Sequence, residues 1–324
     1  MAVNIKKLIF NFVLALIILA AVFILSGCIP HEAGQNISGG SKNSGIRKLA
    51  AGQTNNKANS NNRANSSVNP VNLNIDPNSS FAEAARKNAE TEKNLRWLFG
   101  KKPQTGWYLY KPLISKEIGL EPEAAPTEFA EALAGWQKSA KLQPTGILDE
   151  LTMFAFLSEW QKYRLFRRGY PPEQVLIIAP PDDFYDPSRD AELRQIERET
   201  YDAYKRMVKA AAADPSLKLK TDGGELAPTE NFLKIISSFR TKQYQQKLRA
   251  ASPNSGSAGL AVNSPHFTGR ALDIYVGGEP VSTADANRAI QINTPIYLWM
   301  VKNAGKFGFR PYFYEPWHWE YVPD

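Results

Sequence analysis

Two short stretches near the C-terminal end carry residue types that could hold a metal ion. In the first, His266 precedes Asp273 by seven residues. In the second, Glu315 precedes His318 by three residues. Imidazole nitrogens and carboxylate oxygens are common zinc ligands in proteins, and a catalytic zinc keeps three protein ligands and one open position. We therefore take a single zinc site built from both stretches as the working hypothesis.

Each stretch also contains a residue that would bend the backbone. Gly269 lies between His266 and Asp273, and a turn there would let both side chains face one ion. Pro316 excludes a helix interior in the second stretch, whose carboxylate and imidazole need a bend in order to meet. Simpler readings remain open: Asp273 could be a solvated carboxylate on an edge strand, and His318 could be a core residue hydrogen-bonded to backbone.

The N-terminus has the pattern of an export signal. Lys6 and Lys7 precede an apolar run from Leu8 to Leu25, which ends in Leu25-Ser26-Gly27-Cys28. A basic start, an apolar stretch and small residues at a cleavage site are typical of secreted precursors, and a transmembrane anchor is the alternative. The last four residues resemble the lipobox of bacterial lipoproteins. This resemblance implies a signal peptide over residues 1–27, a lipid and membrane anchor on Cys28, and a place in the cell envelope facing the periplasm or the exterior.

The cysteine and histidine counts narrow the chemistry. Cys28 is the one cysteine of the chain, so no internal disulfide can form. With Cys28 acylated, cysteine nucleophiles and cysteine-rich zinc sites are excluded. The chain has three histidines, and the third, His31, lies in a predicted tether. A metal in the folded part must therefore be held by the two remaining histidines and by carboxylates.

Residues 28–79 are predicted to be a disordered tether, because Gln53 to Ser67 includes no large apolar residue. The formal net charge is +7, but Lys and Arg are scattered rather than clustered, so we expect no nucleic-acid partner. The charge favours a solvated surface with some preference for anionic polymers of the envelope.

Residues 80–160 predict a small, mainly helical domain. A helix is expected from Phe81 to Leu98. Apolar residues at helical spacing mark a second helix, namely Phe129, Leu133 and Trp136. Asp149 can cap a third helix. The inner side of that helix is expected to carry Leu151, Phe154 and Leu157.

Part of this domain resembles the peptidoglycan-binding helical domain found beside many cell-wall hydrolases. The residues that carry the resemblance are Trp136-Gln137, Thr145-Gly146-Ile147-Leu148-Asp149 and Thr152. A helix–turn–helix packing element without a ligand is the alternative. Residues 161–185 are expected to be a linker, in which a basic cluster forms a solvated face (Arg164, Arg167 and Arg168).

Residues 186–324 predict an α+β domain, with a small antiparallel sheet flanked by helices. The expected helices run from Asp186 to about Ala213, from Thr241 to Ala250 and from Thr294 to Ala304. The expected strands cover residues 232–239, 271–276 and 309–322, and the last of these can form a hairpin.

The two chemical stretches together resemble the zinc D-alanyl-D-alanine metallopeptidase family, the VanY and VanX group. The family pattern is Ser-x-His-x-x-Gly-x-Ala-x-Asp followed by Glu-x-x-His. Its fixed positions are all present, as Ser264, His266, Gly269, Ala271, Asp273, Glu315 and His318. An upstream segment, Ser237 to Thr241 with Gln245, is similar to the family's Ser-x-Tyr-Arg-Ser segment, with Phe239 for Tyr and Thr241 for Ser. The resemblance covers roughly residues 190–324.

The resemblance implies a role for each matched residue. It implies that His266, Asp273 and His318 bind Zn²⁺ and that Glu315 is the catalytic base. It also implies that Arg240 contacts the substrate carbonyl or carboxylate, with Ser264 beside it in the substrate-binding site.

The function implied is a zinc-dependent D-alanyl-D-alanine carboxypeptidase acting on peptidoglycan stem peptides. An L,D- or D,D-endopeptidase using the same site is one alternative. A non-catalytic lipoprotein that binds the cell wall is the other.

Overall fold

The computed structural model describes residues 75–323 except 101, 167 and 253–259. The described residues all belong to one compact unit. The predicted signal peptide, Cys28 and nearly all of the tether lie outside the described residues. Within the described part, no helix is long and apolar enough to cross a membrane.

A four-stranded antiparallel sheet lies at the centre of the C-terminal half, as predicted. Its strand order is β7-β8-β10-β9, and every neighbouring pair is antiparallel. The bounds are Ile235–Ser237 for β7, Ala271–Ile274 for β8, Phe309–Pro311 for β9 and His318–Tyr321 for β10. Both central strands, β8 and β10, are buried along their whole length. They pair so that His318 lies opposite Asp273.

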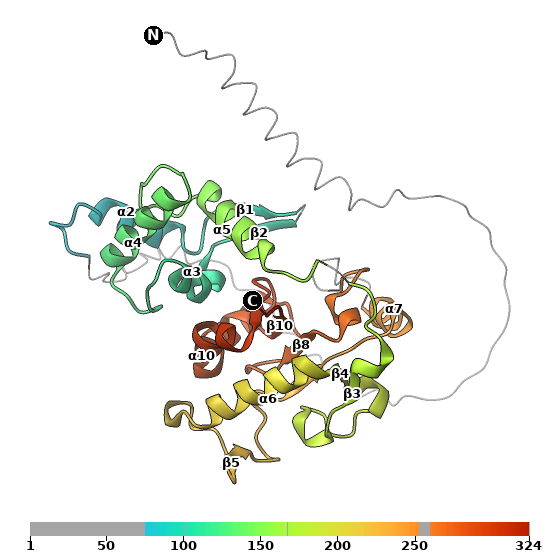
Figure 1. Ribbon diagram of the computed structural model, residues 1–324. Coiled ribbons are helices and arrows are strands. Elements are labelled where there is room, and N and C mark those ends of the chain that lie inside the picture. Colours follow the sequence, from blue (N-terminus) through green and yellow to red (C-terminus); the bar gives the residue numbers. More distant parts are fainter. Residues whose placement is uncertain (1–74, 101, 167, 253–259, 324) are drawn as a thin grey trace, which may run out of the picture. The chain divides into compact units, whose positions relative to one another are not determined.

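Helices surround this sheet (Figure 1). They are α6 (Arg198–Ala212), α7 (Lys242–Ala251), α9 (Asp285–Ile292) and α10 (Pro295–Asn303). The predicted starts of α7 and α10 are both confirmed, and each helix has a threonine cap. The Thr241 hydroxyl accepts a hydrogen bond from the Tyr244 amide at 3.1 Å. The Thr294 hydroxyl accepts one from the Tyr297 amide, also at 3.1 Å.

The N-terminal half of the described chain is mainly helical, also as predicted. Its elements are α2 (Ala82–Thr91), β1 (Arg96–Phe99), β2 (Lys102–Thr105), η1 (Tyr108–Tyr110), α3 (Lys111–Glu117), α4 (Pro126–Ser139) and α5 (Glu150–Lys162). Asp149 caps α5, since its carboxylate accepts the Thr152 amide at 2.8 Å. We refer to residues 75–162 as the helical segment.

The residues that resemble a peptidoglycan-binding domain make hydrogen bonds within the helical segment. Gln137 is 1% exposed. Its amide nitrogen donates to the Ile147 carbonyl and the Thr152 hydroxyl, both at 2.9 Å, and its amide oxygen accepts the Gly146 N–H at 2.8 Å. Asn88 of α2 holds the same turn from the other side, through Gly146 and Leu148. These contacts give the residues of the motif a role in stabilising the fold. That the motif also binds a ligand stays a prediction.

Two predicted helices have different bounds. The helix expected from Phe81 to Leu98 ends at Thr91, and the chain then forms the hairpin of β1 and β2 around Gly100, whose φ is +59°. The helix expected from Asp186 begins only at Arg198. The Asp186 carboxylate accepts from Ser188 in a local turn instead.

The late start of α6 has a tertiary cause. Residues Gln195–Glu197 form β4, which pairs with β3 (Leu176–Ile178) and buries Ile196 completely. Glu197 then caps α6 by accepting the Thr200 amide at 2.9 Å. Strand pairing of Gln195–Glu197 therefore outweighs the helix propensity of the residues before Arg198.

The prediction of the inner face of α5 was also wrong at two of three positions. Leu151 is 60% exposed and Phe154 is 43% exposed, whereas Leu157 is buried as expected. The other buried residues of α5 are Thr152, Met153 and Phe156. The face that packs is thus shifted around the helix, because Phe156 stacks on Trp136 of α4 with ring centroids 3.8 Å apart.

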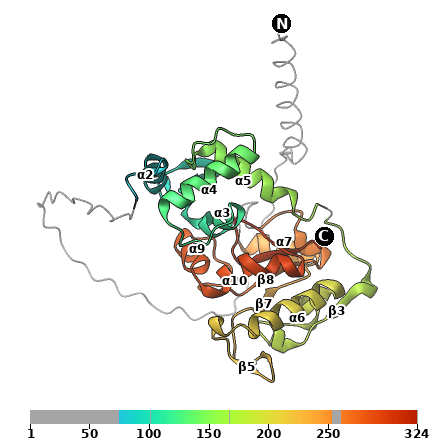
Figure 2. The ribbon, with the colours of Figure 1, turned by 60° about the vertical axis from the view of Figure 1, so that its left-hand side comes forward.

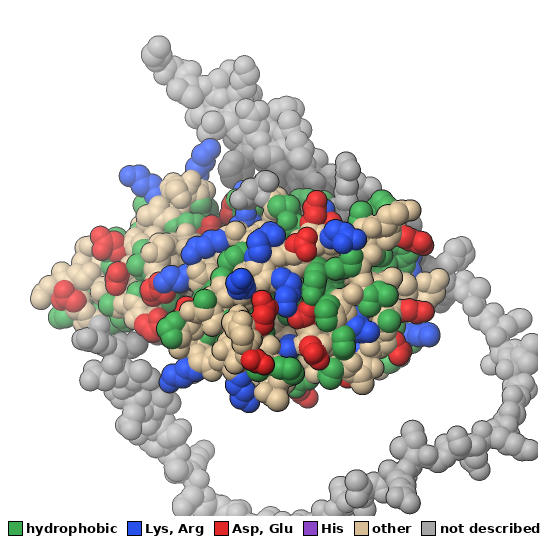
Figure 3. All heavy atoms as spheres, turned by 60° about the horizontal axis from the view of Figure 1, so that its bottom comes forward, with side chains coloured by type: hydrophobic (Ala, Val, Ile, Leu, Met, Phe, Trp, Pro, Cys, Tyr) green, Lys and Arg blue, Asp and Glu red, His purple; other side chains and the backbone are tan. Residues whose placement is uncertain are grey.

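The helical segment packs on the C-terminal half, and one apolar core runs through both. Figure 1 and Figure 2 show α3 of the helical segment next to α10 of the C-terminal half. Phe99 lies edge-on to Phe313 at 5.1 Å, and the Arg288 guanidinium donates to the Tyr110 hydroxyl at 3.0 Å. On the face drawn in Figure 3, basic and acidic side chains are interspersed, in line with the scattered charge of the sequence.

Candidate metal centre

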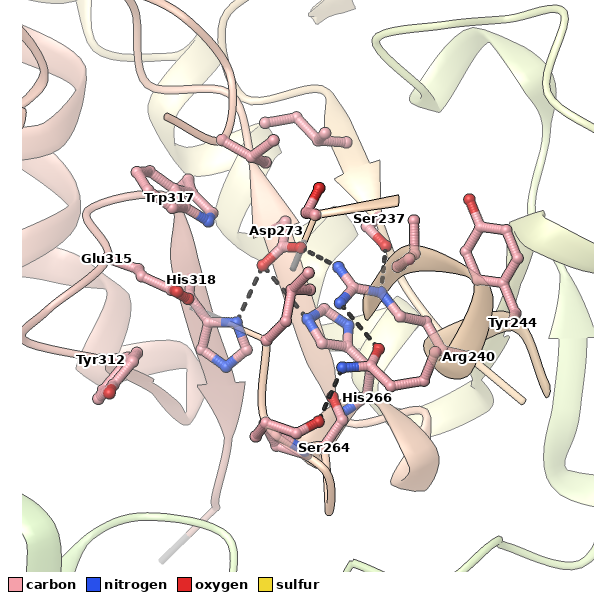
Figure 4. Close-up of a pocket in the computed structure, with 18 of the residues that line it drawn as sticks. Ser237, Arg240, Tyr244, Ser264, His266, Asp273, Tyr312, Glu315, Trp317 and His318 are labelled. Carbon is pink, nitrogen blue, oxygen red and sulfur yellow. Dashed lines mark hydrogen bonds and ion pairs between the residues drawn. The ribbon is translucent and has the colours of Figure 1, made fainter. Parts of the chain in front are cut away.

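A pocket of about 390 Å³ opens beside strands β8 and β10. All six site residues predicted in the folded part line it: Arg240, Ser264, His266, Asp273, Glu315 and His318. Figure 4 shows His266 and His318 pointing toward Asp273 from two sides. The structure thus brings together residues that lie as far apart as 240 and 318 in the sequence.

Three side chains form a group that could hold a metal ion. One ligand atom each from His266, Asp273 and His318 lies within 4.8 Å of the others, and all three residues are buried. His266 Nε2 is 3.3 Å from Asp273 Oδ1, and His318 Nδ1 is 2.9 Å from the same oxygen. The spacing suits three ligands converging on one ion, with the pocket on the open side.

Local structure explains how His266 reaches Asp273. Ser264 caps a short 3₁₀ helix, η7 (Pro265–Thr268), by accepting the His266 amide at 3.3 Å. Gly269 then reverses the chain with φ +70° and leads into β8. The turn predicted at Gly269 is confirmed. A left-handed conformation of this kind is accessible to glycine at little cost.

The second stretch bends as predicted. The Glu315 amide donates to the Tyr312 carbonyl at 3.1 Å, and the His318 amide donates to the Glu315 carbonyl at 2.9 Å. This turn around Pro316 ends where β10 begins. Glu315 is 6% exposed and lines the pocket beside His318 (Figure 4).

Each histidine is oriented by a second hydrogen bond on the ring nitrogen that faces away from Asp273. His266 Nδ1 lies 2.7 Å from the Ser238 carbonyl, so Nδ1 carries the proton and Nε2 presents a lone pair to the site. His318 Nε2 lies 3.3 Å from Glu320 Oε1, which leaves Nδ1 for the site. Such outer partners commonly set the tautomer of metal-binding histidines.

The electrostatics of the group favour a cation. Burial lowers the pKa of His266 to about 4, so its imidazole is neutral. Burial would raise the pKa of Asp273, but its interactions with His266 and Arg240, together with the hydrogen bond to His318, hold it well below its usual range. Burial likewise lowers the pKa of His318, but hydrogen bonds to Asp273 and Glu320 outweigh this and raise it to about 9. Without a metal, His318 therefore keeps a proton between two carboxylates, where a metal cation would replace that charge.

Glu315 has the properties of a group that exchanges a proton near neutral pH. Burial raises the pKa of the Glu315 carboxyl to about 8, against smaller opposing effects of His318 and the nearby arginines. A carboxyl group with a raised pKa close to a metal site is suited to taking a proton and returning it.

Arg240 is held by three partners. Its Nε donates to the Ser237 hydroxyl at 2.8 Å, one Nη donates to the Gln245 side chain at 3.4 Å, and the other pairs with Asp273. Ser237 also pairs with Asp273 in the β7–β8 register. The guanidinium is therefore fixed against one candidate ligand and at the edge of the pocket. Direct contact of Arg240 and Ser264 with a substrate stays a prediction.

The sequence analysis missed part of the site. Arg164, expected to be solvated, lines the pocket with a side chain only 12% exposed and pairs with Glu320. Arg168 and Arg189 also line the pocket, and they lie far from the motif in sequence. Only Glu320 carried a local signal, because it follows His318 by two residues and so shares its face of the strand.

The donor set fits zinc. Two imidazole nitrogens and one carboxylate oxygen match a common ligand set of catalytic zinc, and the outer hydrogen bonds of both histidines are in place. No chemistry of the donors favours a redox metal over zinc.

Comparison with known proteins gives one family. The family model VanY, described as D-alanyl-D-alanine carboxypeptidase, matches residues 193–324. The matched range includes Arg240, the three candidate ligands and Glu315, whereas Arg164 lies outside it. A search of curated proteins finds no match to the chain.

Proposed function

We propose that the chain is a zinc-dependent D,D-carboxypeptidase of peptidoglycan stem peptides, because residues 193–324 match the model of the VanY family of D-alanyl-D-alanine carboxypeptidases. The observation that carries the proposal is the convergence of His266, Asp273 and His318 in one pocket with Glu315. The lipobox-like sequence at Cys28 supports attachment to a membrane of the cell envelope, where such peptides occur.

The residues of the pocket divide the chemistry between them. Zinc held by the three ligands would polarise the scissile carbonyl and acidify a water. Glu315 accepts the proton of the attacking water at its carboxylate and delivers it to the nitrogen of the leaving D-alanine. Arg240 supplies a fixed positive charge beside Asp273, where it can stabilise the carbonyl oxygen as it gains negative charge.

The charge of the pocket supports a substrate with a free carboxylate. Four arginines line it, namely Arg164, Arg168, Arg189 and Arg240, against two acidic residues, Asp273 and Glu315. Arg189 is only partly engaged: one Nη pairs with the Ile236 carbonyl and the other lies 3.5 Å from the Tyr244 hydroxyl. Its buried Nε has no hydrogen-bond partner among the described residues. A terminal carboxylate is a suitable partner for guanidinium groups of this kind.

The two alternative functions would use the same residues of the pocket or fewer of them. An L,D- or D,D-endopeptidase would need the same ligands and the same base, but it would cut bonds that do not end in a free carboxylate. The arginine-rich lining favours the carboxypeptidase. A non-catalytic wall-binding lipoprotein would have no need of Glu315.

The test is a digestion of muropeptides by the full chain in detergent with zinc, followed by mass analysis. We expect loss of one terminal D-alanine, and a reduction of about 100- to 10,000-fold in Glu315→Gln, because acid–base catalysis typically contributes that much. Zinc content should be the same in both proteins. Absence of cleavage by the wild type, or undiminished cleavage by the variant, would contradict the proposal.

A matched pair of substrates separates the two peptidase activities. A pentapeptide stem with a free C-terminal carboxylate should be cleaved much faster than the same peptide with a C-terminal amide. Equal cleavage of both, or internal cuts in cross-linked material, would favour the endopeptidase.

A further inference from the structure

Arg164 enters the pocket from outside the family domain. It follows α5, the last helix of the helical segment, whereas the family match begins at residue 193. Its guanidinium lies over the ring of Tyr312, with the Cζ atom 3.8 Å from the ring centroid. Tyr312 itself lines the pocket. The Arg164 side chain therefore packs on Tyr312, and its nitrogens face Glu320.

The segment around Arg164 holds both oxygens of the Glu320 carboxylate. Arg164 Nε donates to Glu320 Oε1 at 3.0 Å, and its Nη2 donates to the same oxygen. The backbone N–H of Leu165 donates to Oε2 at 2.7 Å. Glu320 is 1% exposed. A carboxylate buried this deeply needs a paired cation, and Arg164 supplies it.

Glu320 in turn orients His318. The oxygen that Arg164 holds, Oε1, lies 3.3 Å from His318 Nε2. The opposite nitrogen, Nδ1, lies 2.9 Å from Asp273 Oδ1. A proton on Nε2, held by Glu320, leaves the lone pair on Nδ1 for a metal. The chain of contacts thus runs from Arg164 through Glu320 and His318 to the candidate ligand group.

We propose that Arg164 is a positioning residue of the metal centre, which acts through Glu320 to orient His318. The centre is then completed by residues that precede the family domain, and the stretch that directly follows the helical segment has a part in metal binding. This inference rests on the proposed zinc centre. It goes further because it assigns to the metal centre an outer residue, Arg164, that lies 156 positions before Glu320 in the sequence.

The first experiment measures zinc affinity of the full chain by competition with a chromophoric chelator. For Arg164→Met we expect binding weaker by about 10- to 100-fold, the usual effect of removing an outer partner of a metal-binding histidine. Arg164→Lys, which keeps the charge but not the fork, should recover part of the loss. Melting of the metal-free proteins, measured alongside, reports whether each variant folds.

A matched control removes another contact that joins the C-terminal half to the part of the chain before the family domain. Tyr110→Phe deletes the hydroxyl that accepts from Arg288, and this pair has no contact with the metal ligands. We expect its zinc affinity to equal that of the wild type. A loss of affinity in Tyr110→Phe as large as in Arg164→Met would overturn the proposal, since general loosening would then explain both.

A double-mutant cycle tests whether Arg164 acts through Glu320. Arg164→Met, Glu320→Gln and the double variant should show similar losses of affinity, because residues in one network are not additive. The absorption spectrum of the cobalt-substituted protein should change in the same three variants and stay unchanged in Tyr110→Phe. Fully additive losses, or a wild-type cobalt spectrum in Arg164→Met, would overturn the inference.

The outcomes separate the two proposals. If the wild-type chain binds no zinc, the proposed function is contradicted. If the wild-type chain binds zinc and both Arg164 variants bind it with unchanged affinity, only the proposed role of Arg164 is contradicted. If Arg164→Met does not fold, Arg164→Lys decides by the same measurements.

Discussion

Replacing Gly269 with alanine tests the turn that brings His266 to Asp273. Gly269 has φ +70°, and a Cβ built there would lie 3.0 Å from the Glu197 backbone nitrogen and 3.1 Å from Leu176 Cδ2. The left-handed conformation costs an L-residue about 1–2 kcal/mol. The lower entropy of the unfolded alanine chain returns about 0.4–1 kcal/mol of this.

The close contacts at Gly269 add a second cost. The backbone of Glu197 cannot move without disturbing the pairing of β3 with β4 and the cap of α6. Overpacking of this kind costs about 1–3 kcal/mol. We therefore expect Gly269→Ala to lower the free energy of unfolding by about 2–4 kcal/mol. The measurement is chemical denaturation of the metal-free chain followed by tryptophan fluorescence.

Two other glycines separate strain from crowding. Gly119 has φ +79° with nothing within 4 Å of a built Cβ, so Gly119→Ala carries strain alone and should cost about 1 kcal/mol. Gly135 lies inside α4, also in open space, so Gly135→Ala should stabilise by about 1 kcal/mol. If Gly269→Ala is no more destabilising than Gly119→Ala, the contact with the Glu197 backbone does not constrain the turn and the reasoning fails.

Three further predictions concern the metal and the helical segment. Dialysis against a chelator should abolish hydrolysis and added Zn²⁺ should restore it, as measured by D-alanine release; activity that persists in metal-free protein would contradict the zinc centre. Asp273→Asn keeps the shape but removes the ligand charge, so bound zinc by elemental analysis should fall to near zero after gel filtration, and stoichiometric zinc would refute this ligand assignment. Gln137→Ala removes three side-chain hydrogen bonds of 2.9 Å or shorter and should cost about 3 kcal/mol at about 1 kcal/mol each, measured by chemical denaturation; a loss below 1 kcal/mol would show that the turn at Gly146 is held by other contacts.

The sequence by itself determined the features that rest on short-range signals. The caps Asp149 and Thr294 predicted the starts of two helices, because a side-chain oxygen and an amide three residues on are enough to form a cap. Gly269 and Pro316 predicted the bends of the two chemical stretches in the same way. The residue types at spacings 266–273 and 315–318 gave the hypothesis of one metal site, and the resemblance to the peptidase family supplied the full set of side chains, Arg240 included.

Only the tertiary structure decided the features that depend on partners distant in the chain. The start of α6 moved to Arg198 because Ile196 pairs in a strand with residues near 177. Gln137, part of a wall-binding-like motif, proved to hold a turn within its own segment. Arg164 appeared as a solvated cation in sequence and became the counter-ion of Glu320. Hydrophobic periodicity reports which face of an element is buried, but it does not report what that face meets, and a charge pair across 156 residues leaves no local pattern.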